Sequence, residues 1–347
     1  MSFNIDNITR ENVKGLSPYS SARDEYVSDG SEMVFLDANE NPFDNGVNRY
    51  PDPQQRGLKA VLAKQKGIRQ ENLLLGNGSD EVLDLLFRAF CEPREDNVIT
   101  IPPTYGMYKV LSGINSIENK EVLLTPDFQP NVPLILKTMD VNSKLLFLCS
   151  PNNPTGNSFN ADGIIKLMKG FSGLVIVDEA YIDFSSQESW VSRLSDFPNL
   201  VVTQTLSKAY GMAGIRLGIC IASKEVVSVL NKIKPPYNVN ELTQQKALER
   251  VSNLNNVKME VSKLLEERTK LNTALTAISF VRTIYTSDAN FILAKVDDAT
   301  KRYNQLLEKG IVVRNRTSQP LCENTLRFTV GTEEENEKLI AALKSLR

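Results

Sequence analysis

Lys208 is the residue of this chain whose surroundings most clearly suggest chemistry. It lies in QTLSKAYGMAGIRLG, residues 204–218, behind an apolar run, with Ser207 before it and Arg216 beyond it. A lysine amine can form a Schiff base with an aldehyde and then act as an acid and a base. The Ser207 hydroxyl and the planar Arg216 guanidinium suit a phosphate. Most single lysines extend to solvent instead, so a catalytic role for Lys208 requires further evidence from other parts of the sequence.

A second candidate anion site is GNGSDE, residues 76–81, between a strand pattern and a helical pattern. Glycines allow a sharp turn, and a helix that begins there offers free N–H groups to a phosphate. We predict that Gly78, Ser79 and Asp80 form this turn. The alternative is an ordinary helix start with Ser79 as the N-cap and acidic residues in the first turn.

Two further stretches place polar side chains directly after buried strands. SPNNPTG, residues 150–156, would direct the Asn153 amide into a cleft, although these residue types also make plain turns. In VIVDEAY, Asp178 ends an apolar run and Tyr181 follows it. A buried carboxylate requires a cation, which could be a protonated ring nitrogen or an internal arginine.

Two arginines near the C-terminus suggest a second anion. Arg327 lies inside the strand pattern NTLRFTVG, and Arg314 lies in VVRNR. A guanidinium in a strand indicates either an anionic ligand or an internal salt bridge, and the sequence leaves both open.

Taken together, these side chains match the functional groups of a phosphorylated pyridine aldehyde. Lys208 suits the aldehyde and Asp178 suits the ring nitrogen, while Asn153 and Tyr181 suit the ring hydroxyl. The phosphate would be held by two stretches, through Gly78, Ser79, Asp80, Ser207 and Arg216. We therefore predict pyridoxal 5'-phosphate as the cofactor.

The composition excludes several other kinds of site. The 347 residues include no histidine, which removes Ser-His-Asp and Cys-His catalysis and histidine-ligated metals. The four cysteines are dispersed, so we expect neither a metal site nor a disulfide framework. The net charge of −2 gives no reason to expect a nucleic-acid partner. Without a membrane-length apolar run or a secretory pattern, we predict a cytoplasmic protein.

The elements that must position these residues are short, almost continuously apolar strands that alternate with helical patterns. Such strands are typical of a mostly parallel sheet with both faces covered, in which ligands bind at the strand ends. From Asn240 a long amphipathic helical pattern begins, followed by a smaller α+β pattern. We predict an α/β fold with a large cofactor-binding domain at residues 40–240. Residues 1–39 and 241–347 would form a smaller α+β domain.

SPNNPTG, VDEAY and TLSKAYGMAGIRLG, in this order and spacing, resemble the pyridoxal-phosphate aminotransferases of the aspartate aminotransferase superfamily. YPDP at residues 50–53, PPTYGMY at residues 102–108 and the terminal LRFTVG narrow the resemblance to the histidinol-phosphate aminotransferases, in class II. The resemblance covers essentially the whole chain. It implies a seven-stranded sheet of the aspartate aminotransferase type, fold type I.

The resemblance also implies roles for several tyrosines and arginines. Tyr105 would stack on the cofactor ring, and Tyr50 would reach the cofactor phosphate of a neighbouring subunit in a homodimer. Arg327 would hold the anionic group of either substrate, with Arg314 and Tyr19 as further members of the substrate site. Tyr19, Tyr105 and Tyr108 are the candidates for reading an imidazole ring.

The implied reaction is a transamination with ping-pong kinetics through a Lys208 Schiff base. It interconverts L-histidinol phosphate and 2-oxoglutarate with imidazole acetol phosphate and L-glutamate, in histidine biosynthesis. Two alternatives share the scaffold: an aromatic amino-acid aminotransferase and a threonine-phosphate decarboxylase. A third is a non-catalytic module that binds the cofactor and regulates a partner.

Overall fold

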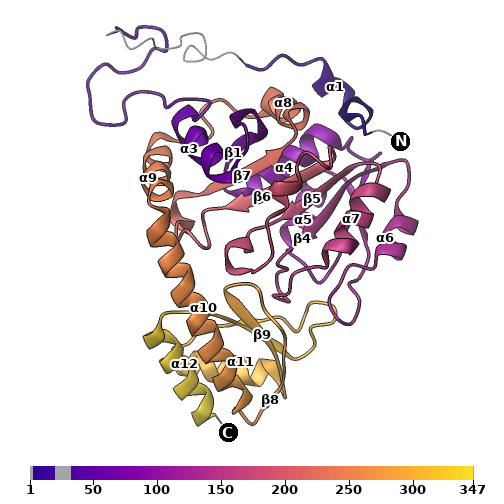
Figure 1. The fold of residues 1–347 in the computed structure, drawn as a ribbon, viewed down its shortest axis with the longest axis vertical. Helices are drawn as coiled ribbons and strands as arrows, with labels where there is room; N and C mark the ends of the chain where they lie inside the picture. The colour runs from indigo at the N-terminus through magenta and orange to yellow at the C-terminus, as the bar shows by residue number, and fades with distance from the viewer. Residues whose placement is uncertain (1–2, 20–32, 347) are drawn as a thin grey trace.

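A computed structural model describes residues 3–19 and 33–346 of the chain. Within these residues it contains a seven-stranded and a four-stranded sheet. Figure 1 shows a larger part built on the first sheet and a smaller part built on the second, with helix α10 (Leu254–Thr276) running from one to the other. No helix in the described ranges is long and apolar enough to cross a membrane.

The larger sheet has the strand order β1-β7-β6-β5-β4-β2-β3. Its strands have these bounds: β1 Leu73–Asn77, β2 Asn97–Thr100, β3 Glu118–Glu121, β4 Ser143–Cys149, β5 Leu174–Asp178, β6 Leu200–Thr205 and β7 Leu217–Ala222. All neighbouring pairs are parallel except those made by β7, which runs antiparallel to both β1 and β6. The sheet is therefore mostly parallel.

Alternation along the central strands creates a core on each face of this sheet. In β4, Leu146 and Leu148 belong to one buried cluster, while Leu145 and Phe147 belong to the other. Successive side chains of a strand point to opposite faces, so an almost continuously apolar strand requires helices on both sides. The helices α3, α6, α7 and α9 contribute to the first cluster, and α4, α5 and α8 contribute to the second.

The helices have the following bounds: α1 Glu11–Lys14, α3 Arg56–Lys66, α4 Ser79–Phe90, α5 Met107–Ile114, α6 Val132–Thr138, α7 Ala161–Gly170, α8 Lys224–Ile233, α9 Glu241–Ser252, α11 Ala299–Glu308 and α12 Glu333–Ser345.

The smaller sheet is antiparallel, in the order β10-β11-β9-β8. Its strands are β8 Val281–Ile284, β9 Phe291–Val296, β10 Arg314–Asn315 and β11 Thr325–Thr329. Helices α10, α11 and α12 bury one shared cluster with it, which includes Leu275, Leu306 and Leu343. This part has a core of its own, as the sequence pattern predicts.

The predicted fold class is confirmed, and two local features differ from the prediction. The long helical pattern after Asn240 is two helices, because Asn253 has non-helical backbone angles and separates α9 from α10. Strand β3 has the polar sequence ENKE at a sheet edge, so no apolar run marked it. The boundary near residue 240 stays a prediction, since α9 packs on the larger part through Ala247 and Val251.

The start of the chain does not pack with the smaller part, contrary to our expectation for residues 1–39. Val13 joins the core beneath α4 and α8, and Arg10 pairs with Glu92 at 2.9 Å. The reason is that this segment supplies an apolar side chain that joins the core of the larger part and a cation that pairs with one of its carboxylates. Residues 20–32 lie outside the described ranges.

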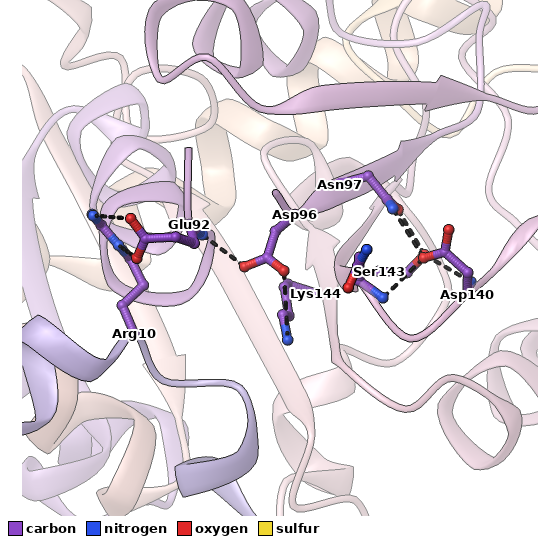
Figure 2. Close-up of polar contacts among 8 residues, drawn as sticks. Arg10, Glu92, Asp96, Asn97, Asp140, Ser143 and Lys144 are labelled. Atoms are coloured by element: carbon purple, nitrogen blue, oxygen red, sulfur yellow. Dashed lines mark hydrogen bonds and ion pairs between the residues drawn. The ribbon is translucent and has the colours of Figure 1, made fainter. Parts of the chain in front are cut away.

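Figure 2 shows this attachment continuing along the edge where the parallel strands begin. The Glu92 N–H donates to Asp96, whose other carboxylate oxygen lies 3.6 Å from the Lys144 amine. Farther along, Ser143 Oγ donates to Asn97 Oδ1 at 2.6 Å. The polar groups at this edge satisfy one another, which is the expected state of buried polar groups in a structural region.

Candidate active site

A cavity of about 640 Å³ opens at the opposite edge of the larger sheet, where the parallel strands end. Cys149, Asp178 and Thr205 are at the ends of β4, β5 and β6, and all three line it. Strand β7 runs the other way and begins at this edge, directly after Arg216. The smaller sheet closes the cavity with Arg314 from β10 and other side chains.

Asp178 is buried, with an exposed fraction of 3%. Its carboxylate accepts a hydrogen bond from the Tyr108 hydroxyl at 2.7 Å and one from the Ala180 N–H at 3.2 Å. Burial raises the pKa of Asp178 above its ordinary value. In the described residues no lysine or arginine forms an ion pair with it, so the internal pair left open by the sequence is absent there.

Lys208 lines the same cavity, and its amine lies 5.7 Å from the centre of the Tyr181 ring. Burial and the nearby Arg327 lower the pKa of the Lys208 amine. A lowered pKa favours the neutral amine, which is the form that attacks a carbonyl carbon.

The connection between β6 and β7 carries both Lys208 and Arg216 and is held at several points. Within it, the Gly211 N–H donates to the Lys208 carbonyl at 3.0 Å. Helix α9 secures it from outside, because Thr243 Oγ1 donates to the Ile215 carbonyl and Arg250 Nε donates to the Tyr210 carbonyl, each at 2.8 Å. The lysine and the arginine therefore have fixed positions relative to the sheet.

Gly78, Ser79 and Arg216 form a cradle at the start of α4. Gly78 is the N-cap with φ of +80°, which favours glycine, and a Cβ added there would lie 2.5 Å from the Arg216 guanidinium, so a side chain would displace that guanidinium. Ser79 is therefore the first residue of the helix and not its cap. The free N–H groups of the helix start, a hydroxyl and a guanidinium meet here, a combination that binds phosphate.

Tyr105 and Asp80 stand beside this cradle. The Tyr105 hydroxyl donates to Asp80 Oδ1 at 3.0 Å, and Arg216 Nη2 lies 3.5 Å from Asp80 Oδ2. Burial raises the pKa of the Tyr105 hydroxyl, so it remains a donor. The contacts of Asp80 thus orient one aromatic ring and one guanidinium toward the cavity.

Three arginines of the smaller part, Arg314, Arg316 and Arg327, line the opposite wall. Arg327 donates from Nη1 to the Asn153 side-chain oxygen and lies over the Phe291 ring, 5.0 Å from its centre. The Asn153 amide thereby links the end of β4 in the larger part to β11 in the smaller one.

The arrangement matches a known family. Residues 31–343 match the family described as aminotransferase class I and II. The histidinol-phosphate aminotransferase of Flavobacterium johnsoniae is 66% identical over 345 residues, which cover 99% of each chain.

This chain belongs to the histidinol-phosphate aminotransferase family.

Two solved structures share its fold. The histidinol-phosphate aminotransferase of Clostridium acetobutylicum superposes with a TM-score of 0.80 at 24% identity, covering 86% of this chain and 90% of the other. The enzyme of the same name from Sinorhizobium meliloti, in complex with pyridoxal-5'-phosphate, has a TM-score of 0.78 at 21% identity, covering 85% and 82%. The predicted membership of this aminotransferase family is confirmed.

Most of the predicted site residues of this family member lie together. Those that line the one cavity are Ser79, Asp80, Tyr105, Asn153, Asp178, Tyr181, Ser207, Lys208, Arg216, Arg314 and Arg327. Gly78 borders it through its contact with Arg216. Tyr19 and Tyr50 are exposed, with exposed fractions of 71% and 50%, and do not line the cavity of their own chain.

Tyr108 is a poor candidate for reading an imidazole ring, because it is fully buried and its hydroxyl is committed to Asp178. The spacing of residues in the α5 sequence could not show which face of this helix packs against β5, and therefore that Tyr108 contacts Asp178. Sequence reasoning also missed Gly218, where a Cβ would lie 2.3 Å from the Ser79 nitrogen. It missed Arg316 as well, although two arginines two residues apart in an extended segment share a face.

The cavity fits a phosphorylated pyridine aldehyde on two observations. Asp178 is a buried acid without a cationic partner among the described residues. At Gly78, φ of +80° favours glycine, and the Arg216 guanidinium lies where a side chain would begin. The first feature suits a protonated ring nitrogen and the second suits a close backbone approach to a phosphate.

Proposed function

We propose that this chain transfers the amino group of L-histidinol phosphate to 2-oxoglutarate, with pyridoxal phosphate as cofactor. The observation that supports this most directly is the content of one cavity. It combines a lysine amine, a buried acid without a cation and a wall of three arginines. The family's name for its members agrees with that chemistry.

Pyridoxal phosphate, when bound, carries the amino group between the two substrates and takes up electrons released at the substrate carbon. In our proposal Lys208 Nζ anchors the cofactor covalently. Once displaced by a substrate amine, the same nitrogen removes the proton from the substrate carbon and later returns one.

The other side chains bind and orient. Asp178 holds a proton on the ring nitrogen, and Tyr108 keeps the Asp178 carboxylate in place. Asn153 and Tyr181 donate to the ring hydroxyl, and Tyr105 covers the ring. The cradle of Gly78, Ser79 and Arg216 holds the cofactor phosphate, together with Asp80 and Ser207.

Substrate anions bind at the arginine wall. Arg327 presents a fork of donors that suits a carboxylate or a phosphate, and Arg314 lies opposite it in the strand register. One site can therefore accept the phosphate ester in one half-reaction and a carboxylate in the other. Because the two substrates use the cavity in turn, we expect ping-pong kinetics.

We further propose that the enzyme is a cytoplasmic homodimer. Several large apolar side chains near the N-terminus are exposed in the single chain: Val34 at 82%, Leu36 at 86%, Phe43 at 80% and Tyr50 at 50%. Exposed large apolar side chains of this kind suit an interface. A second copy would cover it and would receive Tyr50, and with it Tyr19, at its own cavity.

The test is to mix the cofactor-loaded protein with L-histidinol phosphate and follow the absorbance of the cofactor. Phenylalanine and threonine phosphate are run in parallel, and Lys208→Ala serves as the control. We expect rapid amination by histidinol phosphate, much slower reaction with the other two amines, and none with Lys208→Ala.

Preferential reaction with phenylalanine, or release of carbon dioxide from threonine phosphate, would replace the proposed substrate with one of the alternatives. Cofactor bound without any reaction would favour a regulatory module.

A further inference from the structure

We propose that Arg316 is a third phosphate-binding arginine, which makes the substrate site prefer a phosphate dianion to a carboxylate. This inference rests on the proposed function, since it assigns a specificity-determining residue to that same cavity. Arg316 lines the cavity together with Arg314 and Arg327.

The strand register places the three guanidiniums on one side of the smaller sheet. Arg314 of β10 lies directly opposite Arg327 of β11. The pairing continues beyond the strand, because the Arg316 N–H donates to the Thr325 carbonyl at 2.9 Å. Side chains two residues apart in extended backbone share a face, so Arg316 joins the pair formed by Arg314 and Arg327.

Like charges directly opposite one another destabilise a sheet. Within the described residues none of these arginines forms an ion pair with a carboxylate. Two nitrogens, Arg316 Nε and Arg327 Nε, are buried and have no hydrogen-bond partner. The wall therefore holds positive charge and unused donors that suit an anionic ligand.

Arg316 lines the same cavity as Tyr181 and Lys208, in which the reaction is proposed to occur. Arg327 lines this cavity as well, and both guanidiniums act to lower the pKa of the Tyr181 hydroxyl, against the larger effect of burial. Tyr181 in turn lies 5.7 Å from the Lys208 amine. Arg316 is thus within the binding site, beside the arginines already assigned.

The amount of charge argues for a phosphate monoester. A carboxylate carries one negative charge and engages one guanidinium fork, as Arg327 alone provides. A phosphate monoester near pH 8 carries two charges and three strong acceptor oxygens, which can engage more than one guanidinium. In our proposal only one carboxylate of a dicarboxylate occupies this anion site, so loss of Arg316 should weaken binding of the phosphorylated substrate more than binding of the dicarboxylate.

The experiment compares Arg316→Gln and Arg316→Lys with the wild-type holoenzyme at pH 8. Arg282→Gln, on β8 and outside this cavity, is the matched control. The efficiency of cofactor amination, kcat/KM, is measured separately for histidinol phosphate and for glutamate. Calorimetry gives the dissociation constants of inorganic phosphate and of glutarate, a dicarboxylate without an amine.

We expect Arg316→Gln to lower the kcat/KM ratio of histidinol phosphate to glutamate at least tenfold, mainly through KM. The Kd of phosphate should rise at least tenfold relative to that of glutarate. Arg316→Lys, which keeps the charge and loses the fork, should fall between Arg316→Gln and the wild type.

Equal losses for both substrates, or no change in either ratio, would overturn the assignment of Arg316. Failure of the proposed function is a separate result, because it would be seen in the wild type as an absence of reaction with histidinol phosphate. If phosphate affinity still depended on Arg316 in that case, the anion site would stand and the substrate would be another phosphorylated amine.

Discussion

At the scale of single residues, the two edges of the larger sheet differ in how their polar groups are satisfied. At the edge where the strands begin, Asn97, Ser143 and Asp140 hydrogen-bond one another. At the edge where they end, Asp178 is buried without a cation among the described residues. A buried charged group that destabilises the ligand-free protein is a strong candidate for a ligand-binding group.

Asp178→Asn should therefore separate stability from activity. Because burial raises the pKa of Asp178 above 3.8, the free protein loses stability as pH rises from 3.8 through the raised pKa. Asparagine is uncharged, so its burial does not carry the cost of burying a carboxylate. Urea unfolding should therefore show that the cofactor-free variant is more stable than the cofactor-free wild type at pH 8. The gain should shrink as pH falls through the raised pKa toward 3.8. The rate of amino transfer should fall about 10²–10³-fold, as for loss of an electrostatic catalytic contact.

The control is Asp196→Asn, an exposed carboxylate that pairs with Arg193. It should not reproduce either effect. A variant that is less stable than wild type at pH 8, or one that retains full activity, would contradict the role of Asp178.

At the scale of elements, the cradle depends on close contact between β7 and the start of α4. A Cβ at Gly218 would lie 2.3 Å from the Ser79 nitrogen and 2.4 Å from the Gly78 carbonyl carbon. Both atoms belong to the backbone, so neither can rotate away as a side chain could. The close approach of β7 to the start of α4 therefore leaves no room for a side chain at Gly218.

Gly218→Ala should destabilise the protein by about 3 kcal/mol and weaken cofactor binding, because the helix start must move. Gly214→Ala is the matched control, since nothing lies within 4 Å of a Cβ there. Urea unfolding and fluorescence titration with the cofactor measure the two effects. Equal behaviour of the two variants would show that the contact is not required.

The sequence predicted the strands and helices whose burial produces a regular pattern of apolar residues. It did not predict elements that lack such a pattern. Apolar runs such as LVIVD marked the central strands, whereas the polar ENKE of β3 gave no signal. Among the residues of the cavity, Asn153 and Asp178 could be named because they end or follow buried strands, whereas Tyr105 could be named only from the resemblance. Two features could not be predicted in this way: the face of α5 on which Tyr108 lies, and the pairing of Arg314 with Arg327. Both depend on which helices and strands pack together in the fold, and the local sequence pattern does not contain that information.

At the scale of the whole molecule, the proposed dimer makes each cavity depend on two chains. Lys208→Ala and Tyr50→Phe should each lose most of their activity alone. After unfolding and refolding together in equal amounts, roughly half of the dimers would be mixed, and each would have one complete site. The mixture should recover about a quarter of the wild-type activity.

Mixing Lys208→Ala with Asp178→Asn is the control, because both residues line the cavity of one chain. That mixture should recover nothing, since every site lacks one of the two groups. Recovery in both mixtures, or in neither, would argue against a Tyr50 that acts across the interface.

The connection from β6 to β7 has a consequence for how the chain can vary in length. Its ends are fixed by adjacent strands, and α9 holds its middle at the Tyr210 and Ile215 carbonyls. Lys208 and Arg216 both lie between the two strands, so an inserted residue would shift the spacing between the amine and the guanidinium. We expect this connection to tolerate changes of side chain at its exposed positions and to reject insertions, unlike the surface loops on the far side of the sheet.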